Sequence, residues 1–183
     1  MKRREALSSI SLAAGAAVLL PVGLFSSCQE EDYQGQFFAQ STIELINEIG
    51  ETILPETPNS PGAKAAKVGN FLDSYVNACV GKSQQEVLKN GLITFSESCK
   101  EKTGKSFIRL SPNERHQFLI QLGAASKQEN NTDQKYFTTL KSLILFAYFT
   151  SQEGAEKALR YLPIPGKYDG NYAFAKGDKA WAL

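Results

Sequence analysis

Apolar residues recur at intervals of three and four positions along most of this chain, and no segment of useful length alternates between apolar and polar residues. The first pattern lines one face of an α-helix, whereas a half-buried strand would need the second. The strongest helical stretch is 134–149, in which residues 143–149 make most of the circumference apolar. We therefore predict an all-α fold, a single domain of about six helices with short Gly/Pro connections and an irregular, aromatic C-terminal tail.

Local signals predict where these helices begin and end. Pro61 after Ser60 predicts the start of a second helix, and Gly104 predicts a left-handed end to a third. Residues 111–114 and 150–153 each predict a capping box at a helix start. The apolar stripes predict that the inward-facing residues include Phe71, Leu72, Val76, Val87, Leu88, Leu92, Phe95, Phe118, Leu119, Leu122, Phe137, Leu140, Ile144, Ala147 and Tyr148.

Residues 1–27 have the features of an export signal. Arg3 and Arg4 precede the apolar residues 10–25, which are followed by small residues. This order is typical of a secretory signal peptide, and the arginine pair resembles the twin-arginine signal of proteins that are folded before export. A membrane-spanning helix would need roughly 20 mostly apolar residues, so a cleaved signal fits better. Ordinary secretion of an unfolded chain is the alternative.

Cys28 follows Phe25-Ser26-Ser27, which resembles a lipoprotein processing box. Acyl chains on Cys28 would hold the mature protein at a membrane surface through burial of their methylene groups. The polar residues 28–36 predict a flexible linker, and the helical domain then covers residues 37–183, including the tail 163–183. These features predict a membrane-anchored lipoprotein of the periplasm or cell envelope.

Composition and spacing argue against several kinds of site. Lys and Arg number 20 against 19 Asp and Glu residues, so a nucleic-acid interface has no electrostatic basis. His116 is the only histidine, and no second ligand lies at a helical spacing from it, so we predict a surface or half-buried side chain. No set of residues meets the requirements for a nucleophile, base or metal. We expect no catalytic, metal or cofactor site in this chain.

Cys79 and Cys99 remain after Cys28, in what should be an oxidising compartment. If the second and third helices form a hairpin, the two residues lie roughly 20 Å apart, whereas a disulfide needs α-carbons within about 7 Å. We favour two small buried residues and leave a bridge as the alternative.

The last long helix and the tail contain the candidate partner interface. Aromatic residues supply much of the anchoring at protein interfaces, and disordered tails are usually poor in them. Aromatics that fold back onto their own domain would give the same pattern. The candidate interface residues are Phe146, Phe149, Tyr161, Tyr168, Tyr172, Phe174 and Trp181.

An ordered series of sequence blocks resembles a known family. These blocks are residues 54–57, 61–66, 103–107, 141–155, 159–161, 165–170 and 179–181. Together they are similar to the small subunit of gluconate 2-dehydrogenase, the subunit 3 family.

The resemblance implies a small subunit that binds neither flavin nor haem. In that family it associates with a large FAD-dependent dehydrogenase subunit of the glucose-methanol-choline type, often alongside a cytochrome c that carries haem c. A twin-arginine signal on the small subunit carries the partner across the membrane. We therefore expect a non-catalytic accessory subunit that stabilises, co-exports and anchors a sugar or alcohol dehydrogenase. The alternative is a free-standing helical envelope lipoprotein that binds a small ligand or a protein.

Overall fold

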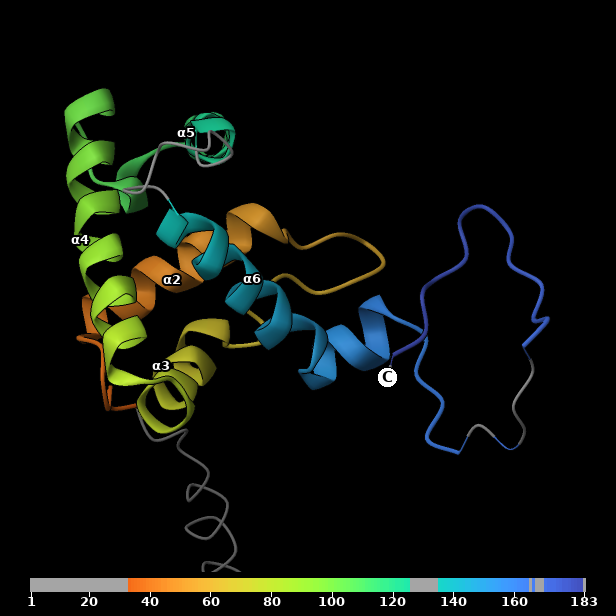
Figure 1. Ribbon diagram of the computed structural model, residues 1–183. Helices are drawn as coiled ribbons and strands as arrows, with labels where there is room; N and C mark the ends of the chain where they lie inside the picture. Colours follow the sequence, from red (N-terminus) through yellow and green to blue (C-terminus); the bar gives the residue numbers. More distant parts are fainter. Residues whose placement is uncertain (1–32, 126–134, 165, 167–169, 183) are drawn as a thin grey trace, which may run out of the picture. The chain divides into compact units, whose positions relative to one another are not determined.

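The computed structural model describes residues 33–125, 135–164, 166 and 170–182. Within them it contains helices and two isolated bridges but no strand, so the all-α prediction is confirmed. The predicted signal, residues 1–27, and Cys28 lie outside the described residues. The elements of residues 34–183 are α2 (Gln40–Ile53), α3 (Val68–Cys79), α4 (Lys82–Thr103), the 3₁₀ helix η2 (Phe107–Arg109), α5 (Pro112–Ala125), α6 (Lys135–Phe149) and the π-helix η4 (Glu153–Ala158) (Figure 1).

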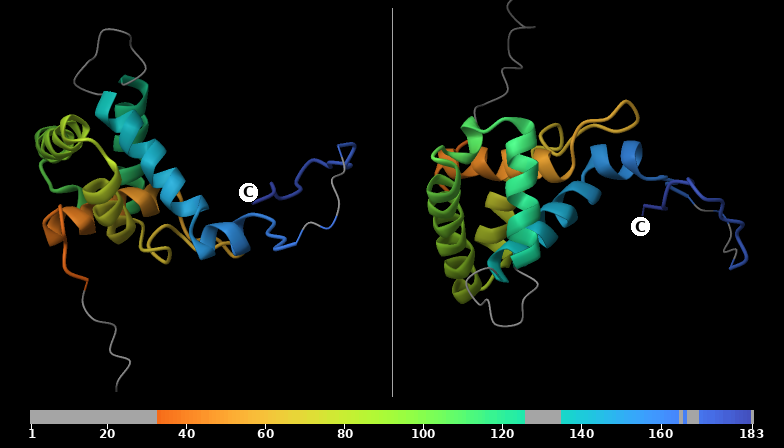
Figure 2. Two further views of the ribbon diagram at one scale, coloured as in Figure 1. Left: turned by 60° about the horizontal axis from the view of Figure 1, so that its bottom comes forward. Right: turned by 90° about the horizontal axis from the view of Figure 1, so that it is seen from above.

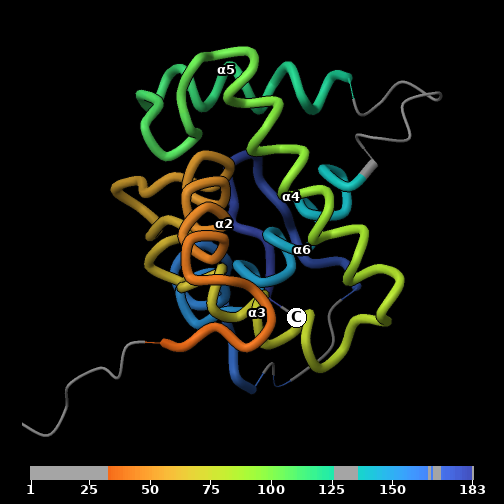
Figure 3. Tube along the Cα trace, turned by 90° about the vertical axis from the view of Figure 1, so that its left-hand side faces the viewer, coloured from red at the N-terminus to blue at the C-terminus, as the bar shows by residue number. Residues whose placement is uncertain are grey.

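α2 and α6 are the two helices around which the others pack. α3 and α5 lie on opposite sides of α2 and contact it (Figure 3). α6 contacts α3, α4 and α5 before it continues into η4 (Figure 2). The apolar stripe of α2 explains this arrangement, since Ile43, Ile46 and Ile49 are completely or almost completely buried.

Three phenylalanines join α4, η2 and α5 at one end of the core. The ring centroid of Phe95 lies 5.1 Å from that of Phe107 and 5.4 Å from that of Phe118, and both pairs meet edge to face. Such pairs contribute about 0.5–1.5 kcal/mol beyond the burial of their surface. The sequence prediction that Phe95 and Phe118 face inward is confirmed.

A buried carboxylate fixes the point at which the chain enters the helical unit. Asp73 of α3 is 0% exposed, and its two oxygens accept the backbone N–H groups of Gln36 (2.6 Å), Phe37 (3.0 Å) and Phe38 (2.5 Å). Asp73 is the only charged residue in the buried core of the described part of the chain. Backbone donors satisfy its oxygens, so the segment before α2 is held against α3.

The second helix begins later than Pro61, the start that the sequence predicted. α3 starts at Val68, residues 63–67 form turns, and residues 61–62 belong to no helix. Glu51 of α2 is the physical reason, because its carboxylate accepts the amide N–H groups of Glu56 and Lys64 and so holds this segment against α2. Lys67 then adopts a left-handed backbone conformation with φ 48°, which interrupts any helix upstream of Val68.

The capping predictions have mixed outcomes. Gly104 ends α4 with φ 72°, as predicted. The first capping box is confirmed: the Ser111 amide donates to the Glu114 carboxylate (2.7 Å), and the Glu114 amide donates to the Ser111 hydroxyl. The hydrogen bond from the Ser111 amide to the carboxylate is the main cause that lowers the pKa of Glu114. The second box is wrong in detail, because the hydroxyl of Ser151 is the acceptor and it receives the amide of Gly154.

Three residues lie at positions that the sequence did not predict. Phe71 and Val87 were expected to face inward, but they are 41% and 54% exposed because α3 and α4 present those sides to solvent. Cys79 ends α3 at the surface, whereas Cys99 is buried as expected and burial raises the pKa of its thiol. Both thiols are free, which agrees with the preference for unbridged cysteines.

Replacing Asp73 by Asn should destabilise the helical unit. Asn presents one acceptor oxygen and an NH₂ group, so at least one of the three amides would face a donor instead of an acceptor. We expect a loss of about 2 kcal/mol in the free energy of unfolding, measured by urea denaturation. The matched control is Asp178→Asn, since Asp178 is exposed and its carboxylate accepts one amide among the described residues, that of Ala175. Equal stability of Asp73→Asn and the wild type would contradict this role.

Candidate interaction surface

Tyr148 fixes the C-terminal end of α6 to two different segments. Its side chain is 2% exposed, and its hydroxyl donates to the carbonyl of Pro61, so α6 holds the loop between α2 and α3. The carbonyl of Tyr148 accepts both the amide (3.1 Å) and the hydroxyl (2.7 Å) of Ser151. The same residue therefore positions the loop on one side and the start of η4 on the other.

The loop of residues 55–62, here called the 55–62 loop, is fixed by its ends and exposed at its tip. Glu51 binds the Glu56 amide at one end and the Lys64 amide just after the other, and a side chain at Gly62 would meet the Glu51 carboxylate at 2.2 Å. Thr57 and Ser60 exchange backbone hydrogen bonds across the tip. Residues 55–59 are nevertheless exposed. The loop and η4 lie at the same end of α6 in both views of Figure 2.

η4 is a π-helix because Gly154 lets the chain pack directly on the end of α6. A Cβ at Gly154 would lie 1.9 Å from the carbonyl oxygen of Tyr148. The Gly154 carbonyl accepts the amide of Leu159, five residues on, which is the π-helical pattern. π-helical turns are frequent at functional sites, and this one brings Leu159 and Arg160 beside the tail.

A shallow hollow of about 470 Å³ lies between the end of α6, η4 and the end of the tail. We call it the Trp181 hollow. Its lining includes Phe149, Gln152, Glu156, Leu159, Tyr161 and Trp181. Most of these side chains are apolar or aromatic, and the Glu156 carboxylate is held by the Gln152 amide at 3.1 Å. A surface of this kind suits an apolar side chain beside a polar or charged one.

Arg160 closes the tail onto the end of η4. Its guanidinium lies 4.1 Å from the ring centroid of Trp181 and 5.3 Å from that of Tyr172, and it donates to the Tyr172 hydroxyl at 2.7 Å. Its backbone donates to the carbonyl of Ala180 and accepts from the amide of Ala182. The Tyr172 and Trp181 rings meet edge to face at 5.7 Å. We call these three side chains the Arg160 clasp.

The predicted interface residues fall into separate places. Phe149, Tyr161 and Trp181 come together at the Trp181 hollow, and Tyr172 joins Trp181 in the clasp. Phe174 is 75% exposed further along the tail. Tyr168 lies outside the described residues.

Phe146 belongs to a different cluster. It packs on Phe71 and Tyr75 of α3, with ring centroids 6.0 Å and 5.3 Å away. Both Phe71 and Phe146 keep about two-fifths of their surface exposed. This cluster joins α3 to α6, and nothing in the described contacts links it to the Trp181 hollow.

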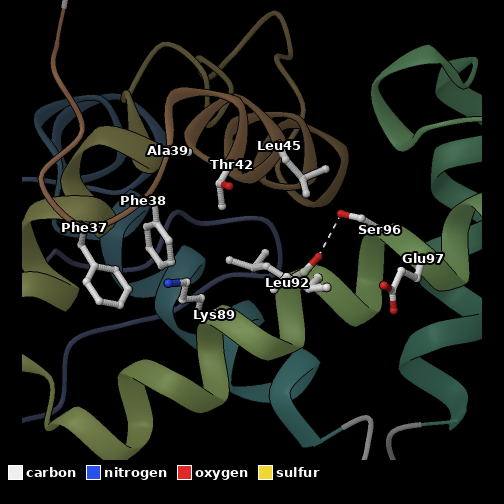
Figure 4. A pocket seen from close by; sticks show the side chains of 10 residues that line it. Phe37, Phe38, Ala39, Thr42, Leu45, Lys89, Leu92, Ser96 and Glu97 are labelled. Carbon is white, nitrogen blue, oxygen red and sulfur yellow. Dashed lines mark hydrogen bonds between the residues drawn. The ribbon is translucent and has the colours of Figure 1, made fainter.

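A second hollow, of about 530 Å³, lies between the start of α2 and the middle of α4. Figure 4 shows Phe37 and Phe38 on one side, Leu92 on the other, and the Lys89 ammonium pointing toward the phenylalanines. Its one marked hydrogen bond, from the Ser96 hydroxyl to the Leu92 carbonyl at 2.9 Å, belongs to α4 itself. The hollow can receive an apolar group, but its lining brings no nucleophile and base together.

The titratable and metal-ligating side chains of the described residues are spread over the structure. No three His, Cys, Asp or Glu side chains among them are grouped so that they could hold a metal ion. His116 is exposed, as predicted. Burial raises the pKa of Tyr136 to about 12, which keeps its hydroxyl protonated. Each helix in the described part of the chain is too short or too polar to cross a bilayer.

Fold and surface together define an all-α protein with exposed aromatic side chains at the C-terminal end of α6. The family of gluconate 2-dehydrogenase subunit 3 matches residues 40–166, which is more than half of the chain. The chain therefore belongs to the gluconate 2-dehydrogenase subunit 3 family, as its sequence blocks indicated. Comparison with curated proteins and with solved structures gives no match.

Sequence reasoning missed three residues that organise this surface. Arg160 was noted within a sequence block but not as the residue that holds Tyr172 and Trp181. Tyr148 was assigned to the core, which is correct, but its hydroxyl bond to Pro61 has no local signal. Glu51 lies on α2, and its carboxylate accepts amides of a loop further along the chain. The sequence alone gives no signal for these hydrogen bonds, which depend on the fold.

Replacing Arg160 by Ala should open the clasp without unfolding the helices. Trp181 is the only tryptophan, so fluorescence excited selectively at tryptophan reports on this site alone. We expect a red-shifted emission and stronger acrylamide quenching, with a change in unfolding free energy of about 1 kcal/mol or less, because exposed cation–π contacts are weak. The control is Arg109→Ala, an exposed arginine on η2. An unchanged spectrum for Arg160→Ala would show that the clasp does not form in solution.

Proposed function

We propose that this chain is a non-catalytic small subunit that stabilises, co-exports and anchors a periplasmic FAD-dependent sugar or alcohol dehydrogenase of the glucose-methanol-choline type. The match of residues 40–166 to gluconate 2-dehydrogenase subunit 3 carries the proposal. In this assignment FAD belongs to the large subunit, and haem c belongs to a cytochrome c subunit where one is present.

The exposed apolar residues at the C-terminal end support a binding role. Ile164 is 81% exposed and Phe174 is 75% exposed, Tyr161 and Tyr172 keep about half of their surface open, and Trp181 keeps about two-fifths. Large apolar residues gathered on one surface often mark an interaction site. Aromatic and arginine side chains are also the residues most enriched among binding hot spots, and the Arg160 clasp brings both types together.

The N-terminal sequence supports export and anchoring. Arg3 and Arg4 would address the chain to an exporter of folded proteins, which permits a cofactor-loaded partner to travel with it. Acyl chains on Cys28 would then hold the complex at the membrane surface. The polar residues 29–36 leave room between that anchor and the helical unit.

Purification of a tagged copy from the native envelope tests the assignment. We expect the chain to require detergent for release from membranes and to bring down a larger protein with the absorbance of bound FAD, in a fixed ratio to the tag. Recovery of the chain alone, released with detergent, would favour a free-standing envelope lipoprotein.

Changing both Arg3 and Arg4 to Lys tests co-export. If the partner depends on this signal, both subunits should accumulate inside the cell, and dehydrogenase activity should be lost from the periplasmic and membrane fractions. The measurement is immunoblotting and flavin content of each fraction. A partner that still reaches the periplasm would remove the carrier role, although the two chains could still form a complex there.

A further inference from the structure

We infer that the C-terminal end of α6 presents one pre-formed docking surface, and that it binds a segment of the large dehydrogenase subunit in which an apolar side chain lies next to a basic one. The surface, here called the α6-end surface, consists of the 55–62 loop, the Trp181 hollow and the Arg160 clasp. The inference rests on the proposed function, because it takes the partner from there.

Tyr148 makes the parts of this surface a single unit. Its hydroxyl binds the carbonyl of Pro61 in the loop, and its carbonyl binds Ser151 at the start of η4. Gly154 packs directly against that carbonyl. A shift of the loop relative to the hollow would break one of these contacts, so the two are positioned together before any partner binds.

Pre-organisation favours binding because little freedom is lost on association. The tip of the 55–62 loop has no cover from its own chain in the described structure, yet Glu51 and Tyr148 fix both of its ends. The end of the tail is likewise exposed but held by Arg160. Exposed segments that are fixed from beneath are what a recognition surface requires.

The charges of this end favour a basic partner. Glu156 is the only charged side chain among the described residues that line the hollow. Of the cations at this end, Lys157 pairs with Glu153, Arg160 stacks on Trp181 outside the lining, and Lys179 donates to the Lys157 carbonyl. Glu56 on the loop and Glu156 at the hollow form no ion pair among the described residues. Lys176 lies further along the tail and does not line the hollow. The charged group that lines the hollow is therefore an anion.

The lining of the hollow favours an apolar side chain beside the basic one in the partner segment. Phe149, Leu159 and Trp181 form an apolar lining in a volume of about 470 Å³, which lies within the range of roughly 300–1,000 Å³ that is typical of ligand sites. An inserted apolar side chain would cover these residues, and a neighbouring Lys or Arg could reach the Glu156 carboxylate. This pairing gives a docking mode with an apolar anchor and a charged contact at its rim.

Three matched pairs of variants test the surface in the full-length chain, with the flavoprotein that co-purifies with the wild type as the probe. Tyr148→Phe removes the hydroxyl bond to the loop, and its control is Tyr136→Phe, also a buried tyrosine of α6. Glu156→Lys reverses the rim charge, and its control is Glu101→Lys on α4. Arg160→Ala opens the clasp, and its control is Arg109→Ala on η2.

Each test variant should retain about tenfold less flavoprotein per tag than its control, which corresponds to about 1.4 kcal/mol of binding free energy. Glu156→Lys should also reverse the salt dependence of association, because the introduced ammonium would repel the basic group of the partner and salt would screen that repulsion. Far-ultraviolet circular dichroism of each variant checks that the helices remain folded.

The outcomes separate the two claims. Wild type that retains no flavoprotein would overturn the proposed function and this inference with it. Wild type that retains flavoprotein while all three test variants bind as well as their controls would overturn the docking surface alone. If Phe71→Ala and Phe146→Ala, made alongside the three pairs, were the only variants to lose flavoprotein, the interface would instead lie on the separate cluster of α3 and α6.

Discussion

The side chain and carbonyl of Tyr148 connect the parts of this protein that could meet a partner. A buried tyrosine contributes apolar burial through its ring, but its hydroxyl must find an acceptor inside the protein. Here the acceptor is the carbonyl of Pro61. This hydrogen bond offsets the cost of burying the hydroxyl, and it also fixes the loop that contains Pro61. Because the Tyr148 carbonyl also receives Ser151, the end of α6 sets the positions of both the loop and η4.

Buried or half-buried carboxylates do similar work elsewhere in the helical unit. Asp73 accepts hydrogen bonds from three backbone amides that precede α2. Glu48 of α2 forms ion pairs with both Lys64 and Arg115. Arg115 in turn donates to the carbonyls of Phe107 and Ile108, which joins η2 to α2. Leaving such groups unpaired would cost more than their bonds contribute, so these residues specify the connections between helices as well as stabilising them.

The sequence predicted those features that depend on neighbours along the chain. Helical periodicity identified the inward faces of α5 and α6, and the Ser111 box and Gly104 marked helix ends correctly, because capping is a contact over three or four residues. Prediction from the sequence failed where a residue far along the chain determines the local structure. Pro61 is an ordinary helix-start signal, but Glu51 takes the Lys64 amide and delays α3. The aromatic residues of the tail were selected by residue type. Arg160 holds two of them, but its contacts are between residues distant in sequence, and the spacing of residues along the chain does not predict them.

The energetics of the tail explain why one arginine can matter so much. Closing about 20 residues between Arg160 and Trp181 costs roughly 2.7 kcal/mol in chain entropy. Two exposed cation–π contacts return about 0.5–1 kcal/mol each, and two backbone hydrogen bonds return about 0.5–1.5 kcal/mol each. These gains and the entropic cost are of similar size, so the closed form is at most marginally favoured, by about 2 kcal/mol. A partner that binds only the closed form would shift the equilibrium between open and closed tails further toward the closed form. Loss of Arg160 would lower the fraction of molecules in the closed form, and the apparent affinity for the partner would fall in proportion.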